Sequence, residues 1–345
     1  MVEILTEEQL KSDPDQQIKA FKKKKRYLVA IDTDGAVVDN MNGKQMLIFH
    51  PLGMSYWDLW SIESYYREIG EFVNLFSKTR GCNRFLALQY QFAYLRDRAD
   101  LQAKAKEAGV RLPDSRALNE YVQSYSKTKK WSPATIEEYR NAHPKDYDVW
   151  KLWGWCRAVN DMFPFVSQKI APFKPVKDCL ELMSEDADII VVSQTPYRDL
   201  AQYWVEHKID ERVALICGQD MGSKADHIEK VKKVAGYADE EVLMLGDADG
   251  DKNAVKKNNG CFFPTNPGGE VESWERLPDA FKKFTANKYR GSFENELIAE
   301  FDKLLPEKPP WELPGYDHQS EYLKRQPIRL TLRDKYNPGA PLLMM

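Results

Sequence analysis

The chain has 345 residues, and its 50 Lys and Arg residues nearly balance 53 Asp and Glu residues, which gives a net charge of −3. This balance excludes a broadly basic nucleic-acid-binding chain and an acidic disordered one, and the length predicts about two domains. The N-terminus lacks a signal-peptide layout, no apolar run approaches the roughly 18 residues of a membrane helix, and the five cysteines form no CxxC pair. We therefore expect a cytoplasmic protein with reduced thiols that binds neither membranes nor nucleic acids.

The first chemically informative segment follows a short amphipathic helical lead-in over residues 1–25. Residues 27–31 (YLVAI) form an apolar, partly β-branched run, which predicts a buried strand. This strand runs directly into the sequence DTDG, so the carboxylates of Asp32 and Asp34 stand at its carboxyl end. Ligands of open α/β sheets bind at that edge of the sheet.

The chain changes character over residues 41–173, where apolar and aromatic residues recur at three- and four-residue spacing with little strand signal. Aromatic residues at helical spacing are typical of a core between packed helices. The segment therefore predicts a helical domain inserted into a different architecture.

Strands and helices alternate after Pro175, with predicted strands over residues 187–192, 213–217, 242–245 and 260–263. This alternation predicts a parallel sheet that is covered by helices on both faces. The last forty residues hold seven of the 19 prolines, which predicts an extended arm that lies on the surface or reaches a partner. The predicted parts are a lead-in (1–25), an α/β core (26–40 and 174–290), a helical domain (41–173), and a C-terminal helix with a proline-rich arm (291–345).

Polar side chains of complementary type follow the predicted strands: Asp32 and Asp34, then Ser193, then Lys224, then Asp247 with Asp251. Because the carboxyl ends of parallel strands share one edge, these groups can converge although they lie far apart in the sequence. Clustered carboxylates repel one another unless a cation lies among them, and hard oxygen ligands in an incomplete protein cage favour Mg²⁺. A hydroxyl and an ammonium group at the same edge would face an anion held by that metal. The set therefore predicts a phosphoryl-transfer site.

Four motifs in this order resemble those of the haloacid dehalogenase-like (HAD) superfamily of phosphohydrolases. The first, a strand followed by Asp-x-Asp-Gly, matches YLVAIDTDG, and the second, a strand ending in Ser or Thr, matches IIVVS at Ser193. The third, a lone Lys at a helix start, matches GSKADHI at Lys224, and the fourth matches VLMLGDADGD at Asp247 and Asp251. The resemblance implies an α/β fold, a Rossmann-like parallel sheet with an inserted all-helical cap domain.

The resemblance also implies the chemistry of three aspartates. Asp32 would be the nucleophile that takes up the phosphoryl group as an aspartyl phosphate. Asp34 would act as general acid toward the leaving group and then as general base for water. The side chains of Asp32 and Asp247 and the backbone carbonyl of Asp34 would bind Mg²⁺.

Four further residues would support these three by the same resemblance. Ser193 would hydrogen-bond a phosphoryl oxygen, and Lys224 would neutralise its charge. Asp251 would orient a metal-bound water or Lys224. Gly35 would form a tight turn that brings backbone amides near the phosphate.

The helical insertion has the position and character of the family's C1 cap, which closes over the site and supplies substrate contacts. Within it, residues 77–84 place a polar cluster between two helical stretches. Arg80, Asn83 and Arg84 are therefore candidates for substrate contact. The alternative is that they are solvated polar groups at a helix joint.

Two positions depart from the family pattern, and one carboxylate falls outside it. Thr33 stands where many relatives carry an apolar residue, and Ala225 follows Lys224 where relatives with helical caps carry proline. Asp249 does not fit the family spacing, and we expect it to be solvated.

The sequence thus predicts a Mg²⁺-dependent phosphatase that hydrolyses a small phosphorylated metabolite through an aspartyl phosphate. A phosphomutase of the same fold would use the same residues. A metal-dependent glycosyltransferase also uses Asp-x-Asp, but it does not predict the later GDxxxD. A non-enzymatic binding module is a further alternative, in which the large cap and the arm would serve a partner.

Overall fold

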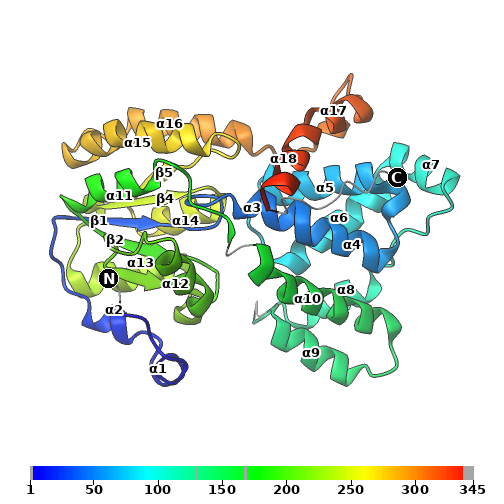
Figure 1. Cartoon of the computed structure of the whole chain (residues 1–345), viewed down its shortest axis with the longest axis horizontal. Helices are drawn as coiled ribbons and strands as arrows, with labels where there is room; N and C mark the ends of the chain where they lie inside the picture. The colour runs from blue at the N-terminus through cyan, green and yellow to red at the C-terminus, as the bar shows by residue number, and fades with distance from the viewer. Residues whose placement is uncertain (1–2, 129–130, 167–168, 337–345) are drawn as a thin grey trace. The chain divides into compact units, whose positions relative to one another are not determined.

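The computed structural model describes residues 3–128, 131–166 and 169–336 (Figure 1). It divides the chain into two compact units. The first unit contains the chain up to Asn40 together with Ala171–Leu305, and the second contains Met41–Ile170 together with the chain from Pro306 onward. The first unit therefore extends past the core boundaries predicted from the sequence, because it includes both the N-terminal lead-in and residues 291–305.

The first unit is built on a parallel five-stranded sheet with the order β3-β2-β1-β4-β5. All residues of the five strands are buried, as expected of a parallel sheet covered on both faces by helices. The strands are β1 (Tyr27–Ile31), β2 (Ala187–Val192), β3 (Leu215–Cys217), β4 (Val242–Gly246) and β5 (Cys261–Pro264).

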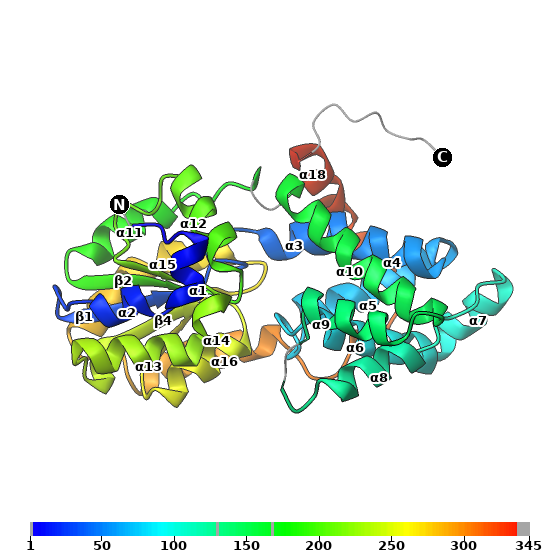
Figure 2. The same ribbon diagram turned by 90° about the horizontal axis from the view of Figure 1, so that it is seen from below.

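Helices connect the strands and cover the sheet, and Figure 2 shows α11 and α12 on one face and α13 and α14 on the other. This arrangement follows from right-handed crossovers, because the chain moves outward in one direction from β1 and then returns past it to β4 and β5. The helices are α11 (Val176–Ser184), α12 (Tyr197–Glu206), α13 (Lys224–Ala235), α14 (Asp249–Lys257), α15 (Glu270–Thr285) and α16 (Ser292–Leu304), with short 3₁₀ turns at Gln219–Met221 and Asp239–Glu241. The predicted doubly covered α/β sheet is confirmed.

The register of the central strands brings their carboxyl ends to one level. Ile31 of β1 pairs with Val191 of β2 on one side and with Leu245 of β4 on the other. The residues that follow each strand, Asp32 and Asp247 among them, therefore emerge at the same edge of the sheet.

The N-terminal lead-in forms two short helices, α1 (Glu7–Ser12) and α2 (Gln16–Ala20), where the sequence predicted one. Asp13, Pro14 and Asp15 separate them, a turn-forming run in which the Asp13 side chain accepts a hydrogen bond from the Asp15 amide. The segment is fixed to the α/β unit, because Lys230 of α13 lies 2.7 Å from the carboxylate of Asp15.

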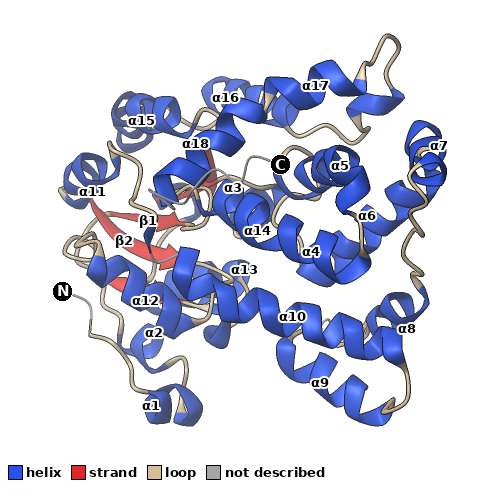
Figure 3. Cartoon of the chain, turned by 45° about the vertical axis from the view of Figure 1, so that its right-hand side comes forward, coloured by secondary structure: helices blue, strands red, loops and turns tan. Residues whose placement is uncertain are grey.

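Helices are the only regular secondary structure among the described residues of the second unit (Figure 3). Its core is aromatic, as the spacing predicted: Trp57 and Phe85 both make edge contacts with Trp155, and Trp57 also contacts Phe92. The elements are α3 (Asn40–Lys44), a π-helical turn (Gln45–Phe49), α4 (His50–Trp57), a 3₁₀ turn (Trp60–Ile62), α5 (Glu63–Leu75), α6 (Arg84–Asp97), α7 (Ala99–Glu107), α8 (Arg116–Ser124), α9 (Pro133–Ala142) and α10 (Tyr147–Val166).

The C-terminal segment differs from the extended arm that its prolines predicted. It forms a 3₁₀ turn (Pro310–Glu312) and two helices, α17 (His318–Lys324) and α18 (Gln326–Tyr336), and it belongs to the helical unit. Buried charges on α5 hold it there: Glu71 pairs with Arg325 at 2.6 Å and with Arg329 at 2.7 Å. Proline content alone does not reveal these long-range pairs. The last part of the predicted arm, residues 337–345, lies outside the described residues.

None of the helices in the described ranges has the length and the apolar character needed to cross a membrane.

A buried histidine in the α/β unit is expected to make the folded state less stable at acidic pH. His227 of α13 is fully buried, and neither ring nitrogen has a hydrogen-bond partner among the described residues. Burial, with a smaller effect from Lys230, lowers the pKa of His227 from 6.5 to about 4. Between those pH values the unfolded chain binds a proton that the folded chain does not, so the folded state loses stability as the pH falls. The loss should reach about 3 kcal/mol near the lower pKa.

The measurement is the denaturant midpoint of the wild type and of His227→Leu as a function of pH. We expect the leucine variant to lose less stability on acidification than the wild type. His207→Leu, on a partly exposed histidine of the same unit, is the matched control. Parallel pH profiles for the wild type and His227→Leu would show that His227 does not cause the acid sensitivity.

Candidate active site

Three buried carboxylates meet at the carboxyl edge of the sheet. Asp32 follows β1, Asp247 follows β4, and Asp251 lies in the first turn of α14. Each offers a carboxylate oxygen, and these oxygens all lie within 4.8 Å of one another. The three residues are 4%, 2% and 0% exposed, respectively, so they form a concentrated negative charge that is shielded from water.

Lys224 places an ammonium group against this cluster. It is the first residue of α13, whose start is fixed by a capping box between Ser223 and Asp226. Its Nζ lies 2.6 Å from Oδ2 of Asp32 and 2.6 Å from Oδ1 of Asp251. Lys224 therefore bridges two of the three carboxylates, which lie 219 positions apart in the sequence.

The crowding of charged groups shifts the pKa values of Asp32 and Lys224. Burial raises the pKa of Asp32 well above its ordinary value; Lys224 opposes this shift, and the neighbouring Asp251 and Asp247 add to it. Burial opposes the charged form of Lys224, but Asp251 and Asp32 outweigh it and raise the pKa of the lysine. The cluster thus holds three carboxylates and one ammonium group, which pairs with two of them, and the remaining negative charge favours binding of a cation.

The Asp34 carboxylate is not a member of the three-carboxylate group, and it accepts two side-chain hydrogen bonds. Its Oδ1 accepts a hydrogen bond of 2.7 Å from the side-chain amide of Asn40, and its Oδ2 accepts one of 3.0 Å from the hydroxyl of Thr195. Two donors on separate segments therefore fix the direction of this carboxylate. Neither donor was predicted from the sequence, although the SQTP sequence after β2 already contained Thr195.

The second motif places Ser193 directly after β2. Ser193 is 2% exposed, and its hydroxyl oxygen accepts a 3.1 Å hydrogen bond from the backbone amide of Thr195. Its backbone amide continues the sheet by donating to the carbonyl of Cys217. The serine hydroxyl is thus fixed at the same edge as Asp32.

Thr33 stands where many relatives carry an apolar residue, and the structure shows how the polar side chain is accommodated there. The Thr33 hydroxyl accepts a buried 3.0 Å hydrogen bond from the indole nitrogen of Trp204 on α12. A buried hydroxyl without a partner would cost stability, and this contact satisfies it. The polar residue is therefore compatible with the buried position between Asp32 and Asp34.

Two positions in the motifs require glycine: Gly35 because of its backbone conformation, and Gly246 because a side chain would not fit. Gly35 has φ of 83°, in the region that glycine adopts without strain, and its amide donates to the carbonyl of Val38 at 2.8 Å. A Cβ on Gly246 would collide with the side chain of Asp251. Gly246 therefore allows the carboxylate of Asp251 to approach the end of β4, where it accepts hydrogen bonds from the amides of Asp247 and Ala248.

Asp249 lies outside the cluster, and it is not simply solvated. Its carboxylate is 2.8 Å from Nζ of Lys252, one turn along α14, and its side chain is 21% exposed. Lys252 also pairs with Asp302 of α16 at 2.6 Å. Asp249 therefore takes part in a surface ion-pair network that joins α14 to α16.

The three cap candidates all belong to the helical unit and make contacts within it. Arg80 is buried and donates to the carbonyl of Leu75 at 2.9 Å. The side-chain oxygen of Asn83 caps α6, and its amide donates to the carbonyl of Trp131. Arg84 donates to the side chain of Asn160 at 2.7 Å. The polar cluster is thus integrated into the helical unit, and its contact with a substrate stays a prediction.

The donor set of the cluster fits a hard divalent cation. Three carboxylate oxygens within 4.8 Å of one another supply oxygen ligands and an excess of negative charge, and the described residues add no histidine or cysteine to this group. Such a set suits Mg²⁺, which takes oxygen ligands and keeps several water ligands. The cluster can therefore hold a metal beside Lys224, and the Ser193 hydroxyl lies at the same edge of the sheet. A bound metal, a carboxylate nucleophile, an ammonium group and a hydroxyl are the groups that phosphoryl transfer uses.

Several haloacid dehalogenase-like hydrolases of known structure are similar to this chain. One, a haloacid dehalogenase-like family hydrolase from Xanthomonas campestris, is 11% identical with a TM-score of 0.45, and the match covers 78% of this chain and 97% of that one. No protein-family model matches the chain, and no curated protein sequence matches it.

Two further structures are similar to the chain. A HAD-superfamily hydrolase of subfamily IA from Geobacter sulfurreducens is 12% identical with a TM-score of 0.35, and the match covers 70% of this chain and 88% of that one. A protein described as a predicted phosphoglycolate phosphatase from Haemophilus somnus is 13% identical with a TM-score of 0.39, with 70% and 86% covered. Because these identities are so low, the activity of this chain must be inferred from its own residues.

Proposed function

We propose that the chain is a Mg²⁺-dependent phosphatase that hydrolyses a small phosphorylated metabolite through an aspartyl phosphate on Asp32. The observation that carries the proposal is the convergence of the Asp32, Asp247 and Asp251 carboxylates, two of which, Asp32 and Asp251, pair with the ammonium group of Lys224. Structural carboxylates are seldom buried three together, since each additional charge raises the cost of desolvation. A site that binds a cation and a phosphoryl group accounts for the burial of these three carboxylates together.

Asp32 is the nucleophile in this proposal. Its carboxylate oxygen attacks phosphorus, the new O–P bond forms, and the bond between phosphorus and the alcohol oxygen breaks. Asp34 gives a proton to the departing alkoxide. In the second half, Asp34 takes a proton from water, the water oxygen attacks phosphorus, and phosphate leaves as the Asp32 carboxylate is restored.

The other residues bind charge and fix geometry. Lys224 pairs with the phosphoryl oxygens, and the Ser193 hydroxyl donates to one of them. Asn40 and Thr195 hold the Asp34 carboxylate in one direction, so that the proton is transferred at a fixed position. Asp251 holds Lys224 toward Asp32.

Mg²⁺ would be held by the side chains of Asp32 and Asp247 and by the backbone carbonyl of Asp34. Its chemistry is to offset the negative charge of the carboxylates and of the phosphoryl group, so that an anionic nucleophile can approach an anionic substrate. Asp251 also offers an oxygen to the same group. Its ion pair with Lys224 favours the supporting role.

Removal of the metal tests this function. We expect hydrolysis of p-nitrophenyl phosphate to fall about 100-fold or more in EDTA and to return when Mg²⁺ is added, since losing the cation costs several kcal/mol of charge stabilisation. Phosphate release and alcohol release should be equal, which distinguishes a phosphatase from a phosphomutase that returns the phosphoryl group to substrate.

Asp249→Asn is the matched control for this experiment, because it removes a neighbouring carboxylate that pairs with Lys252 outside the cluster. This variant should retain both turnover and Mg²⁺ dependence. Turnover that is indifferent to EDTA, or the absence of turnover on a broad set of phosphorylated metabolites with Mg²⁺ present, would contradict the proposed function.

A further inference from the structure

Two buried tryptophans of the α/β unit donate hydrogen bonds to the loop that follows β1. Trp204 of α12 donates from its indole nitrogen to the hydroxyl of Thr33 at 3.0 Å. Trp274 of α15 donates from its indole nitrogen to the backbone carbonyl of Ala36 at 2.6 Å. The two tryptophans are 0% and 1% exposed, respectively. Residues 32–38, here called the first-motif loop, are therefore held by two helices that lie far from the loop in the sequence.

Thr33 connects the first of these contacts to the proposed nucleophile. The backbone amide of Thr33 donates to Oδ1 of Asp32 at 2.7 Å, while Oδ2 of Asp32 lies 2.6 Å from Nζ of Lys224. A carboxylate that is held at both oxygens keeps one orientation. The position of Thr33 therefore sets the direction of the Asp32 carboxylate, and the hydrogen bond from Trp204 fixes the position of Thr33.

Ala36 connects the second contact to the turn that carries Asp34. The amide of Val37 donates to the carbonyl of Thr33 at 2.9 Å, which closes a compact turn around Asp34. Ala36 is fully buried inside this turn, and its carbonyl accepts the hydrogen bond from Trp274. Trp274 therefore restrains the backbone of the turn, which includes the proposed metal-binding carbonyl of Asp34.

The α/β unit contains two tryptophans, and both donate to the first-motif loop. A buried indole N–H needs an acceptor, but a backbone carbonyl of a neighbouring helix would satisfy it equally well. The acceptors are instead in the loop that carries the proposed nucleophile and general acid. Thr33 departs from the family pattern in the direction that serves this contact, because an apolar residue there would leave the Trp204 nitrogen without its acceptor.

We propose that Trp204 and Trp274 form an indole clamp, a pair of positioning residues that holds the first-motif loop in the geometry that metal binding and phosphoryl transfer require. Their role rests on the proposed function, because the tasks of Asp32 and Asp34 belong to it. Reacting groups must be held to within about 0.5 Å, and a misplacement of about 1 Å can cost about 100-fold in rate. Two hydrogen bonds from packed helices supply such a restraint.

Titration with Mg²⁺, with heat as the readout, tests the clamp without requiring turnover. Trp204→Phe and Trp274→Phe each remove the N–H donor and keep an aromatic ring, and Thr33→Val removes the acceptor and keeps the shape of the side chain. We expect each variant to bind Mg²⁺ about 10-fold more weakly than the wild type, as lost outer-shell hydrogen bonds do. Thr33→Ser keeps the hydroxyl and should bind Mg²⁺ within about twofold of the wild type.

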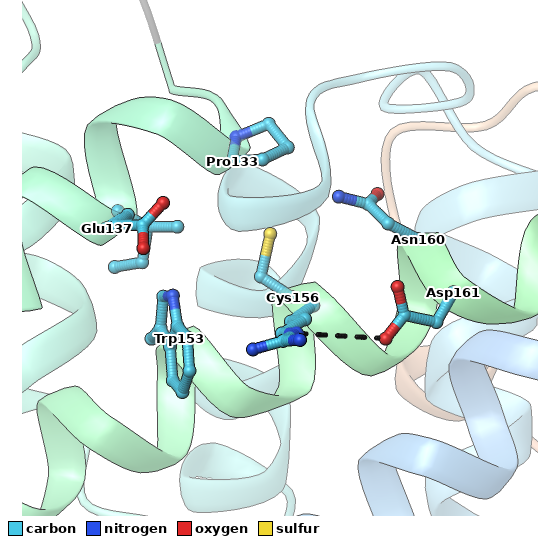
Figure 4. Close-up of a pocket in the computed structure, with 8 residues that line it drawn as sticks. Pro133, Glu137, Trp153, Cys156, Asn160 and Asp161 are labelled. Carbon is cyan, nitrogen blue, oxygen red and sulfur yellow. Dashed lines mark ion pairs between the residues drawn. The ribbon is translucent and has the colours of Figure 1, made fainter.

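Tyr289→Phe is the matched control for a lost buried hydrogen bond. Tyr289 is fully buried, and its hydroxyl donates to the carbonyl of Phe262 in β5 at 2.7 Å. This variant should unfold at a lower denaturant concentration, because the carbonyl loses its partner, and it should keep the Mg²⁺ affinity of the wild type. Trp153→Phe controls for the loss of an indole, since Trp153 lines a pocket of the helical unit (Figure 4) and stacks with Arg140 at 4.2 Å.

Turnover of p-nitrophenyl phosphate at saturating Mg²⁺ separates positioning from stability. We expect Trp204→Phe and Thr33→Val to lower kcat about 10- to 100-fold and to change KM less than about threefold. Replacing both partners with apolar groups leaves no unpaired polar atom, so the double variant should be at least as stable as either single variant. Its kcat should stay as low as that of the single variants and fall no further, because both substitutions break the same bond.

Wild-type Mg²⁺ affinity in the variants of either tryptophan, or an equal loss of affinity in Tyr289→Phe, would overturn the clamp. A double variant whose kcat recovers together with its stability would also overturn it, because the contact would then be merely structural. Thr33→Val covers the case in which Trp204→Phe folds poorly. A wild type that binds Mg²⁺ but shows no metal-dependent turnover would contradict the proposed phosphatase, and the Mg²⁺ titrations would still decide whether the clamp exists. A wild type that binds no Mg²⁺ would contradict both.

Discussion

Asp32→Asn should reduce the hydrolysis of phosphomonoesters by several orders of magnitude. The substitution keeps the size of the side chain but replaces an attacking carboxylate with a neutral amide, and it removes one oxygen ligand of the proposed metal. The measurement is kcat on an alkyl and on an aryl phosphate at saturating Mg²⁺. The effect should be similar on both substrates, because the attacking group is lost in either case.

Retention of more than about a tenth of the wild-type activity, a factor worth only ~1.4 kcal/mol, would exclude Asp32 as the nucleophile. Stability must be measured in parallel, since Asp32 and Lys224 form a buried pair at 2.6 Å. Asp32→Asn removes an unfavourable buried charge as well as a partner of Lys224. A variant that is folded and inactive is therefore the informative result.

Asp34→Asn should separate proton transfer from metal binding. General acid–base catalysis is typically worth 10²–10⁴-fold, so turnover of an alkyl phosphate should fall within that range. An activated aryl phosphate should lose less in the first half-reaction, because its leaving group departs without a proton. Mg²⁺ affinity should stay within a few-fold of the wild type, because Asp34 is proposed to bind the metal through its backbone carbonyl.

Asp247→Asn is the comparison, because it removes a ligand charge and should weaken Mg²⁺ binding directly. Thr195→Val probes the same proton transfer more gently, since it removes one of the two donors that direct the Asp34 carboxylate. Equal losses on alkyl and aryl phosphates for Asp34→Asn in the first half-reaction, measured as the initial release of alcohol, would remove the general-acid assignment. A large loss of Mg²⁺ affinity in that variant would instead indicate an Asp-x-Asp metal site of the glycosyltransferase type.

The sheet was predictable because its strands are short apolar runs, and a polar residue directly follows β1, β2 and β4. The predicted strands 27–31 and 187–192 match the structure in full, and α13 begins at Lys224, where the third motif predicted a helix start. The strand predicted over 213–217 is shorter, because Val213 takes part in a turn, where its amide donates to the carbonyl of Asp210. The local sequence pattern therefore predicts a strand well where all of its residues are buried.

The charged residues of the candidate site were predictable from the sequence, but the hydrogen-bond partners that orient them were not. Asp32, Lys224, Asp247 and Asp251 follow strands or begin helices, so parallel topology alone brings them to one edge. The hydrogen bond between Thr195 and Asp34 joins residues 161 positions apart and depends on the direction of two side chains. Nothing in the local sequence encodes that direction.

The C-terminal segment was mispredicted for a related reason. Its prolines indicated an extended arm, but its helices are fixed by contacts with α5, among them His318, whose Nδ1 lies 2.8 Å from Glu68 and whose ring stacks on Tyr65. Contacts of this kind depend on the tertiary fold. Composition describes the segment in isolation and therefore does not reveal them.

Trapping the phosphoryl group on Asp32 tests the central claim most directly. Asp34→Asn is the suitable enzyme, because with an aryl phosphate it should form the aspartyl phosphate and then hydrolyse it slowly without its general base. The experiment mixes this variant with Mg²⁺ and p-nitrophenyl phosphate, quenches with acid and maps the digested protein by mass spectrometry. We predict a gain of one phosphoryl group on the peptide that contains Asp32 and no gain in the Asp32→Asn variant. Steady turnover with no phosphorylated peptide, or with the phosphoryl group on a peptide that lacks Asp32, would contradict the mechanism.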